Sequence, residues 1–331
     1  MSEAKKLKPT MKIGTHSGTF HADESLAVYM LKLLPEYASA ELIRSRDPEI
    51  LETCSIIVDV GGKYEEPKHF DHHQRGFTET FSEEHETKLS SAGLIYKHFG
   101  KQVLGQILNI PASGEKVNVL YTKIYNDFIE ALDANDNGIS AYPDSVSAAF
   151  KTHNTTLPGL VAKLNPLWTE ASDDAAFDRQ FQKASQLMGE AFVSVVLSSG
   201  NGWYPAKEIV QTALKERHQY DKEGRVVVFE EFVPWKDHLH NLESEEGSEG
   251  QILYVLYKDS GDSWRIQAVP ESSSSFVSRK PLPEPWRGVR DDELSKITEI
   301  PGCVFVHASG FIGGNKTKEG VLAMCRKSLQ Y

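Results

Sequence analysis

The sequence has only three cysteines among 331 residues, and no two of them are close together. Cys54, Cys303 and Cys325 form no C-x-x-C pair, so the pattern predicts neither a disulfide framework nor a structural zinc site. Each cysteine stands among apolar residues, where a thiol is more often part of the core than a nucleophile. The cysteine content therefore indicates a protein of a reducing compartment.

Long apolar runs are also missing. No stretch approaches the roughly 20 apolar residues of a transmembrane helix, so we expect no membrane span. Residues 1–11 contain lysines but no arginine and no apolar stretch, so neither a secretory nor a mitochondrial signal is evident. We expect a cytoplasmic protein, with the nucleus as the alternative compartment.

The sequence lacks an excess of positive charge. Its 36 Lys and Arg residues are outnumbered by 47 Asp and Glu residues, which gives a net charge of −11 at pH 7. This balance argues against a protein that coats duplex DNA through a broad basic face. An enzyme that takes the end of a nucleic acid into a pocket is not excluded, because bound cations add positive charge that the sequence count omits.

Short apolar runs alternate with helical segments near the start of the chain. Strands are expected at residues 11–15, 40–46 and 54–60, with helices at 23–34 and 47–52 between them. This alternation predicts an α/β domain with a parallel sheet and crossover helices. Ligands of such sheets bind beyond the carboxyl ends of the strands.

Histidines and carboxylates stand where these strands end. Asp59 follows the apolar residues 56–58, and Asp71, His72 and His73 follow a short run that is the next strand or its exit loop. Carboxylates that bridge two hard cations, with imidazoles in the remaining positions, are typical of a two-metal site. In the alternative to a metal site, Asp71 caps a turn and the two histidines are ordinary surface residues. A second group after the first strand favours the metal site, and it consists of His16, His21, Asp23 and Glu24.

Three aspartates also have ordinary structural explanations. Asp23 lies in the first turn of an expected helix, where a carboxylate suits the helix dipole, although His21 before it favours a ligand. Asp133 and Asp136 lie at the end of the helix expected at 118–132, where carboxylates oppose the dipole and a metal would compensate. Asp and Asn side chains that bond their own backbone in a polar turn are the alternative there.

The pattern changes near residue 220. Long helices at 173–197 and 203–218 are followed by strands expected at 226–229, 252–257 and 264–269. Between the first two strands lies an acidic segment, residues 243–250, that we expect to be mobile. We therefore predict two domains, residues 11–220 with a helical connector and residues 221–331.

Two segments of the second domain have the composition of anion-binding sites. Arg279 and Lys280 follow a polar loop, and residues 307–317 connect a strand to a helix through Gly313 and Gly314. Glycines let backbone amides approach an anion, and a helix start adds a favourable field. The spacing is not that of a P-loop, and a tight strand-to-helix connection is the alternative. With His307 and a lysine both present, we favour an anion-contacting loop.

Five sequence blocks occur in a fixed order. They are THSGTFHADE at residues 15–24, VDVGG at 58–62, DHHQR at 71–75, DANDNG at 133–138 and HASGFIGG at 307–314. Together they resemble the MYG family, a branch of the DHH phosphoesterase superfamily related to RecJ-type exonucleases and manganese pyrophosphatases. The resemblance extends from about residue 12 to residue 329.

The resemblance implies a DHH-type parallel-sheet metal domain and a smaller C-terminal α/β substrate domain, with the site in the cleft between them. It implies two divalent cations, Mn²⁺ or alternatively Mg²⁺, and phosphodiester hydrolysis. Members of this branch are similar to 3′→5′ exonucleases that act on single-stranded RNA during RNA processing.

The resemblance also assigns roles by position. The implied metal ligands are His16, His21, Asp23, Asp59, His72 and Asp133, with Asp136 as the alternative to Asp133. Asp59 bridges the ions, and His73 contacts the substrate phosphate, so these two are the implied catalytic residues. The implied substrate-binding residues are Asp71, Arg279, Lys280, His307, Gly313 and Gly314.

One departure from the wider superfamily leaves the substrate open. The usual Asp-x-Asp of the first motif is His21-x-Asp23 here, which lowers the negative charge of the site by one. A phosphatase for short oligonucleotides or small phosphoanhydrides is a second reading, and dependence of rate on oligonucleotide length would separate the two. A non-catalytic metal-binding interaction protein is a third. All three are compatible with a homo-oligomer.

Overall fold

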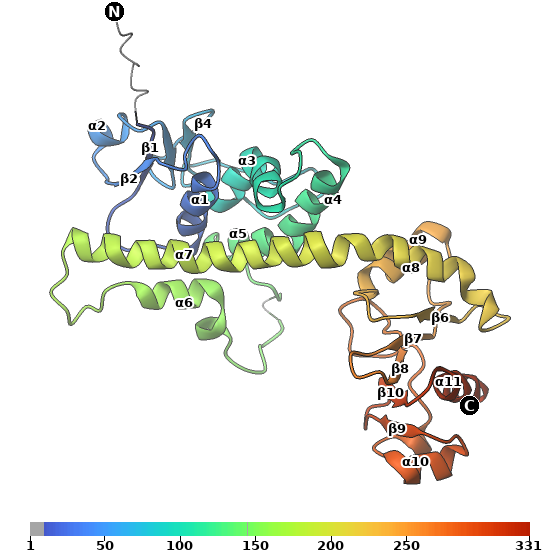
Figure 1. Cartoon of the computed structure of the whole chain (residues 1–331). Helices are drawn as coiled ribbons and strands as arrows, with labels where there is room; N and C mark the ends of the chain where they lie inside the picture. Colours follow the sequence, from blue (N-terminus) through green and yellow to red (C-terminus); the bar gives the residue numbers. More distant parts are fainter. Residues whose placement is uncertain (1–9, 144) are drawn as a thin grey trace, which may run out of the picture. The chain divides into compact units, whose positions relative to one another are not determined.

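The computed structural model describes residues 10–143 and 145–331. It divides the chain into two compact units, Met1–Gly200 and Asn201–Tyr331 (Figure 1). The domain boundary that we predicted lies further along the chain, at residues 220/221. The two divisions differ over the helix α8 (Tyr204–Glu216), which packs on β6 (Val226–Phe229) and α9 (Lys236–Glu246) of the second unit.

The first unit is built on a five-stranded sheet with the order β2-β1-β3-β5-β4. The strands are β1 (Lys12–Thr15), β2 (Glu41–Arg44), β3 (Ile56–Val58), β4 (Tyr64–Glu65) and β5 (His69–Phe70). All neighbours pair in parallel except β4 and β5, which form an antiparallel pair at one edge. The predicted parallel sheet is therefore confirmed, and β1, β3 and β5 end side by side.

Helices pack on both faces of this sheet. On one face lie α1 (Ala22–Lys32) and α3 (Ser91–Leu108), which pack on each other and on the long helix α7 (Asp174–Ser198). On the other face the short helix α2 (Pro48–Leu51) covers Ile57 through Leu51. Gly14 allows this approach, because a Cβ atom there would lie 2.9 Å from the sulfur of Cys54.

The helix predicted at residues 118–132 is divided into three pieces. They are α4 (Glu115–Ile124), the π-helical turn η1 (Tyr125–Ile129) and α5 (Glu130–Asp136). A π-helical turn has a wider hydrogen-bond spacing than an α-helix, so it rotates the face that the following residues present. After it come η2 (His153–Thr155) and α6 (Leu157–Leu164), and α6 packs on α7.

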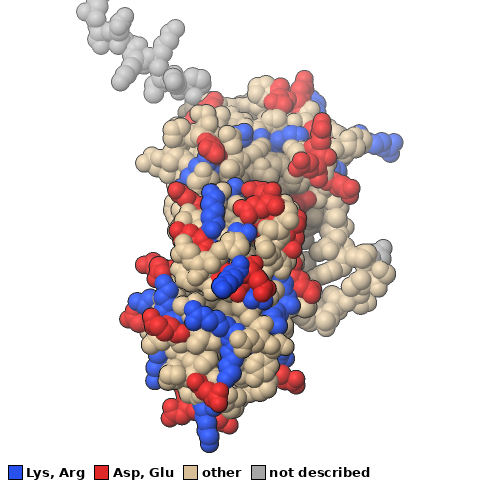
Figure 2. All heavy atoms as spheres, turned by 90° about the vertical axis from the view of Figure 1, so that its right-hand side faces the viewer, with Lys and Arg blue, Asp and Glu red and all other residues tan. Residues whose placement is uncertain are grey.

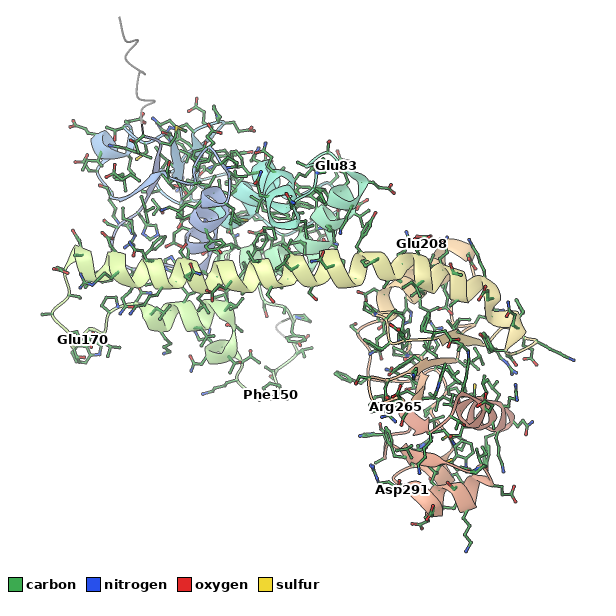
Figure 3. The ribbon with its side chains drawn as sticks, in the orientation of Figure 1. Glu83, Phe150, Glu170, Glu208, Arg265 and Asp291 are labelled. Atoms are coloured by element: carbon green, nitrogen blue, oxygen red, sulfur yellow. The ribbon has the colours of Figure 1, made fainter. Side chains whose placement is uncertain are left out.

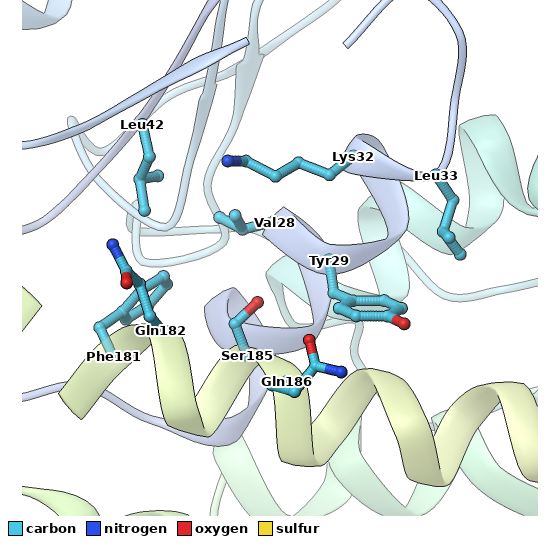
Figure 4. A pocket seen from close by; sticks show the side chains of 9 residues that line it. All are labelled: Val28, Tyr29, Lys32, Leu33, Leu42, Phe181, Gln182, Ser185 and Gln186. Carbon is cyan, nitrogen blue, oxygen red and sulfur yellow. The ribbon is translucent and has the colours of Figure 1, made fainter. Parts of the chain in front are cut away.

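The contact between α1 and α7 is close because of a glycine. A Cβ atom at Gly189 would lie 2.2 Å from the ring of Tyr29, so no larger residue fits there without movement. Beside this contact is a cavity of about 320 Å³, and Figure 4 shows the side chains of α1 and α7 around it. Because Leu42 of β2 also lines this cavity, it lies within the first unit.

The second unit has its own five-stranded sheet, with the order β6-β7-β8-β10-β9. Its other strands are β7 (Tyr254–Lys258), β8 (Trp264–Ala268), β9 (Cys303–Val306) and β10 (Ile312–Asn315). Only β6 and β7 pair in parallel, and the other pairs are antiparallel. The remaining elements are η3 (Ser199–Trp203), η4 (Arg217–Gln219), η5 (Glu284–Trp286), α10 (Asp291–Thr298) and α11 (Lys318–Gln330). The chain is thus of the predicted α/β class.

Two segments of the second unit differ from the sequence interpretation. The helix α9 reaches Glu246 and so includes half of the acidic segment at 243–250 that we expected to be mobile. Its Glu243 is buried, and its carboxylate is satisfied there by hydrogen bonds from the backbone N–H of Ile252 and from Arg279. The expected strand-to-helix loop at residues 307–317 contains the strand β10, so it is a β-hairpin with β9 followed by α11.

Acidic and basic side chains are interspersed on the surface. The face in Figure 2 shows Lys and Arg next to Asp and Glu. Among the described residues, no helix is both long enough and apolar enough to cross a membrane. All three cysteines are free and buried, as expected for thiols that pack in the core.

Candidate metal centre

The predicted site residues follow three neighbouring parallel strands. His16 comes directly after β1, Asp59 after β3, and Asp71 after β5. The carboxyl ends of parallel strands meet at the same edge of a sheet, and all three residues are buried there. The topology that we inferred from the sequence therefore brings these side chains together.

Asp59 lies at the centre of the cluster. Its backbone has a φ of 57°, in the left-handed region that Asp and Asn tolerate better than other non-glycine residues. One carboxylate oxygen lies 3.3 Å from Nε2 of His16, and the other lies 3.4 Å from Nε2 of His72. The hydroxyl of Ser91, at the start of α3, donates a hydrogen bond of 3.1 Å to this carboxylate. Asp59 thus connects two imidazoles from different strand ends.

The first group of candidate ligands surrounds His16. Nε2 of His16 lies 3.2 Å from Oε1 of Glu24, which has no exposed side-chain surface. The same carboxylate accepts a hydrogen bond of 2.8 Å from the backbone N–H of His21, the residue that precedes α1. The start of α1 therefore fixes Glu24 against His16 while His21 stays exposed at the rim.

The second group surrounds His72. Its Nε2 lies 3.0 Å from Oδ2 of Asp136, the last residue of α5. Asp23, in the first turn of α1, belongs to the same group and is 1% exposed. His73 is different, because its side chain is 61% exposed and its Nδ1 lies 2.8 Å from Oδ1 of Asp71.

Three sets of side chains within the described residues have ligand atoms close enough to share a cation. The ligand atoms of each set lie within 4.8 Å of one another. The sets are His16, His21, Glu24 and Asp59; Asp59, His72 and His73; and Asp23, His72 and Asp136. Because Asp59 and His72 each belong to two sets, the three sets overlap in one continuous cluster.

The buried carboxylate of Asp23 indicates whether the cluster is suited to cations. Neither oxygen of Asp23 accepts a hydrogen bond from any donor in residues 10–143 and 145–331, although both are buried. A buried charged group without a partner is strongly disfavoured, and coordination of a cation is one way to satisfy it. Carboxylates suit hard divalent cations, and imidazoles are common ligands of transition-metal ions. The residues present therefore fit divalent cations.

The pKa values of the cluster follow from burial and mutual contact. Burial lowers the pKa of His16, but its bonds to Asp59 and Glu24 outweigh burial and raise the pKa to about 10. In the same way, Asp136 and Asp59 raise the pKa of His72 to about 9 against the effect of burial. The imidazoles thus hold protons that a cation must displace, so cation binding is expected to strengthen as pH rises.

The carboxylates of the cluster differ in the direction of their pKa shift. Burial raises the pKa of Asp59, but the bonds to His16 and His72 outweigh it, so the pKa is lowered overall. Burial raises the pKa of Asp23 well above its usual value, and the negative charges of Asp59 and Asp136 raise it further. Asp23 therefore has the strongest electrostatic reason to gain from a bound cation.

Asp71 orients the residues around it. Its Oδ2 accepts a hydrogen bond of 2.6 Å from the backbone N–H of Gly62, and its Oδ1 accepts one of 3.1 Å from the backbone N–H of His73. The contact with Asp71 also raises the pKa of His73. We predicted Asp71 as a substrate-binding residue, but it is buried and holds the loop after β3 against His73.

Asp133 was predicted as a metal ligand, and the structure gives it different partners. Its carboxylate accepts hydrogen bonds from the backbone N–H and the hydroxyl of Ser90, at 3.0 and 2.7 Å, and from the hydroxyl of Tyr125 at 3.1 Å. A Cβ atom at Gly93 would lie 2.3 Å from this carboxylate. Asp133 is thus enclosed between α3 and η1, and the alternative residue, Asp136, lies beside His72.

The buried position of Asp133 leads to a prediction about pH. Burial raises its pKa to about 7, although hydrogen bonds from Ser90 and Tyr125 oppose the shift. Because the folded-state pKa exceeds the unfolded one, this group lowers the stability of the fold as pH rises from about 4 to about 7. Asp133→Asn is expected to remove this pH dependence. The free energy of unfolding of the variant should therefore rise relative to that of the wild type by about 1–3 kcal/mol between pH 4 and pH 7.

Urea unfolding at pH 4.5 and pH 7.5 with a chelator present measures this effect. A half-exposed carboxylate replaced in the same way, Asp127→Asn, serves as the control for the loss of one negative charge. A wild type and an Asp133→Asn protein with parallel pH profiles would contradict the assignment of the slope to Asp133.

The substrate-binding residues predicted in the second unit have mixed positions. Arg279 is an ion-pair partner of buried Glu243, with N–O distances of 2.7 and 2.8 Å, and its side chain is 9% exposed. Gly313 and Gly314 lie inside β10, where a Cβ atom would collide with neighbouring side chains, so close packing explains them. Lys280 is half-buried and His307 is exposed, with Nδ1 of His307 2.9 Å from the hydroxyl of Ser309.

Three contributors to the centre carry little signal in the sequence. Glu24 was seen in the first motif but was not predicted as a ligand, because a carboxylate in a first helical turn has an ordinary explanation. A serine at the start of a helix, such as Ser91, also has an ordinary structural explanation. Arg46, after β2, donates to the backbone carbonyl of Ser17 at 3.2 Å and lies 3.3 Å from Nδ1 of His16.

The fold and the site together define an α/β protein with a candidate centre for divalent cations at the carboxyl edge of a parallel sheet. Residues 12–329 match the family model MYG1_exonuc, described as uncharacterised protein family UPF0160. The chain therefore belongs to the MYG1 family, which confirms the resemblance drawn from its motifs.

Curated relatives support this membership over most or all of their length. The chain is 49% identical to a MYG1 protein of Saccharomyces cerevisiae, with 99% of this chain and 100% of the relative covered. It is 51% identical to a MYG1 protein of Schizosaccharomyces pombe, with 97% of this chain and 98% of the relative covered. It is 48% identical to the MYG1 exonuclease of Homo sapiens, covering 98% and 87%.

Two solved structures of RecJ also match, weakly. RecJ of Thermus thermophilus in complex with Mn²⁺ gives a TM-score of 0.26 at 14% identity, and the chain spans about half of its length (52%). An exonuclease RecJ bound to manganese gives a TM-score of 0.26 at 12% identity, with 90% of its length covered. Membership of the family accordingly rests on the sequence relatives.

Proposed function

We propose that this protein is a metal-dependent exonuclease that removes nucleotides from the 3′ end of single-stranded RNA, with two divalent cations, preferably Mn²⁺. The observation that carries the proposal is the position of Asp59 between His16 and His72, with the unsatisfied carboxylate of Asp23 in the same cluster. The name of the human relative, MYG1 exonuclease, supports the nuclease class. A role in RNA processing, in the cytoplasm or the nucleus, belongs to the same proposal.

Different residues of the cluster would hold the cations and orient the ligands. His16, His72, Asp23, Asp59 and Asp136 would hold the cations, and His21 and Glu24 would complete the first position. Cations bound there supply positive charge beside the scissile phosphate and make a nucleophilic water more acidic. Ser91 holds Asp59 in place through its hydrogen bond, so the carboxylate is oriented before substrate binds.

His73 is suited to contact the substrate. Asp71 lies 2.8 Å from its Nδ1, so the proton on that nitrogen is held and the ring orientation is restricted. The exposed ring then offers Nε2 as a donor to a phosphate oxygen when the imidazole is protonated, and the raised pKa favours that form. Asp71 therefore acts through His73 rather than on the substrate.

A time course on a 5′-labelled single-stranded RNA tests the proposal directly. With Mn²⁺ we expect a ladder that shortens toward the label, and with EDTA we expect intact RNA. A single-stranded DNA of the same sequence and a dinucleotide are the matched substrates. Cleavage of the dinucleotide beside an intact RNA would instead establish a phosphatase for short oligonucleotides. Release of the label as a mononucleotide without shortened labelled intermediates would reverse the proposed polarity.

A further inference from the structure

A cavity of about 380 Å³ lies in the second unit, whereas the candidate metal ligands all belong to the first. This volume is within the roughly 300–1,000 Å³ of small-molecule pockets. Its walls combine aromatic rings with polar groups from η3, the loop after β6, α9, β8 and the loop after β8. The lining residues include Trp203, Phe232, Lys236, Asp237, Gln267 and Ser273.

The aromatic walls are held in place by other side chains. The ring of Trp203 lies 4.3 Å from the ring of His238, and Nε2 of His238 is 2.7 Å from the backbone oxygen of Trp203. Phe232 meets the ring of Tyr257 edge to face at 5.2 Å, although Phe232 itself is 59% exposed. An exposed but braced aromatic ring is the arrangement on which a planar ligand stacks.

A buried amide adds hydrogen-bonding capacity to the cavity. Gln267, in β8, is only 9% exposed, and its Oε1 accepts a hydrogen bond of 3.0 Å from the hydroxyl of Tyr257. This bond fixes the orientation of the amide of Gln267, which lines the cavity, and the NH₂ group of such an amide is a hydrogen-bond donor. A carbonyl oxygen on the edge of a nucleobase is a matching acceptor.

Charge distinguishes this cavity from another groove of the same unit. That groove, of about 530 Å³ beside α8 and β6, is lined by Glu208, Glu216 and Glu231, which would repel a phosphate. The lining residues of the aromatic cavity include one carboxylate, Asp237, which is balanced by the cation of exposed Lys236. Lys236 suits a phosphate, and the hydroxyl of exposed Ser273 suits a sugar.

We propose that this cavity binds one nucleobase of a single-stranded nucleic acid. The base stacks on Phe232 and accepts a hydrogen bond from the amide of Gln267, while Lys236 contacts the adjoining phosphate. The proposal rests on the proposed function for the kind of polymer that is bound, but the binding itself requires neither a cation nor hydrolysis.

The test measures binding with hydrolysis abolished. Full-length protein carrying Asp59→Asn is titrated in EDTA with AMP and with UMP, and the tryptophan fluorescence is followed, because Trp203 lines the cavity. We expect saturable quenching, with inorganic phosphate producing none. Phe232→Ala in the same background should weaken binding about five- to hundred-fold, the range for loss of one base stack. Absence of saturable binding of both nucleotides would overturn the proposal.

A matched variant separates stacking from a general loss of an exposed phenylalanine. Phe150, in the loop before α6, is 75% exposed and belongs to the first unit (Figure 3). Phe150→Ala should bind AMP as the parent does. An equal loss of affinity in both variants would show that the cavity is not the binding site.

The activity assay distinguishes this proposal from the proposed function. With Mn²⁺ and no Asp59 substitution, Phe232→Ala should raise the KM for a single-stranded RNA by a similar factor while kcat stays within about two-fold. Binding of AMP without hydrolysis of any RNA would refute the exonuclease and leave the nucleobase pocket. Hydrolysis with unchanged KM in Phe232→Ala would refute the pocket and leave the exonuclease.

Discussion

Replacement of Asp59 by Asn is expected to reduce RNA hydrolysis by roughly 10³-fold or more while the protein remains folded. The loss follows because Asp59 is the carboxylate that lies against both His16 and His72, so no single neighbour can take over its position. Retention of the fold follows from the backbone, since Asn tolerates the left-handed φ of 57° about as well as Asp does. Ala at this position would add backbone strain and obscure the result.

Two measurements on the Asp59→Asn protein test this prediction: the initial rate on a labelled RNA, and the metal content after dialysis against Mn²⁺. Thermal unfolding in EDTA is the check on folding, and Asp127→Asn, a half-exposed carboxylate paired with Lys123, is the control. We expect the Asp59→Asn protein to hold less Mn²⁺ than the control. Rates equal to the wild type after reloading with metal would rule out Asp59 as the bridging carboxylate.

Asp23→Asn is expected to make the protein more stable than the wild type without Mn²⁺ and less stable than the wild type with Mn²⁺. Without a cation, the wild type contains a buried carboxylate that receives no hydrogen bond from the described residues and whose ionisation neighbouring charges disfavour. Asn removes this cost, so the variant should be more stable in EDTA by about 1–3 kcal/mol. A cation at roughly 1,000 times its Kd stabilises the wild type by about 4 kcal/mol, and the variant gains much less because it lacks a charged ligand.

Unfolding in urea, measured for both proteins in EDTA and in a series of Mn²⁺ concentrations, tests the inversion. The two stability curves should cross as Mn²⁺ rises. Equal stabilisation of wild type and variant by Mn²⁺ would show that Asp23 does not bind the cation. Parallel measurements with Ca²⁺ separate a specific effect of Mn²⁺ from general screening of the acidic cluster.

Much of the centre could be predicted from the sequence because strand ends are easy to locate. Apolar runs mark β1 and β3, and the carboxyl ends of parallel strands share one edge of a sheet, so His16 and Asp59 could be placed together. The choice between Asp133 and Asp136 could not be made in this way. The π-helical turn η1 changes which face the following residues present, and no residue pattern marks such a turn.

The second unit was harder to predict because its residues act through distant partners. Arg279 is suited by type to bind phosphate, yet it pairs with Glu243, which lies 36 positions earlier in the chain. The glycines at 313 and 314 suggested a loop, but the neighbouring strands β8 and β9 demand small residues in β10. Contacts between distant segments decided these cases, and a single sequence does not show them.

The left-handed backbone at Asp59 has a consequence for natural variation in this gene. A single base change in an aspartate codon can produce Asn or Gly, and both residues accept a positive φ. Such alleles are expected to yield normal amounts of a well-folded protein without its chemistry. Screens that score cellular abundance would therefore class them as benign, and only an assay of catalysis would recognise them as null alleles.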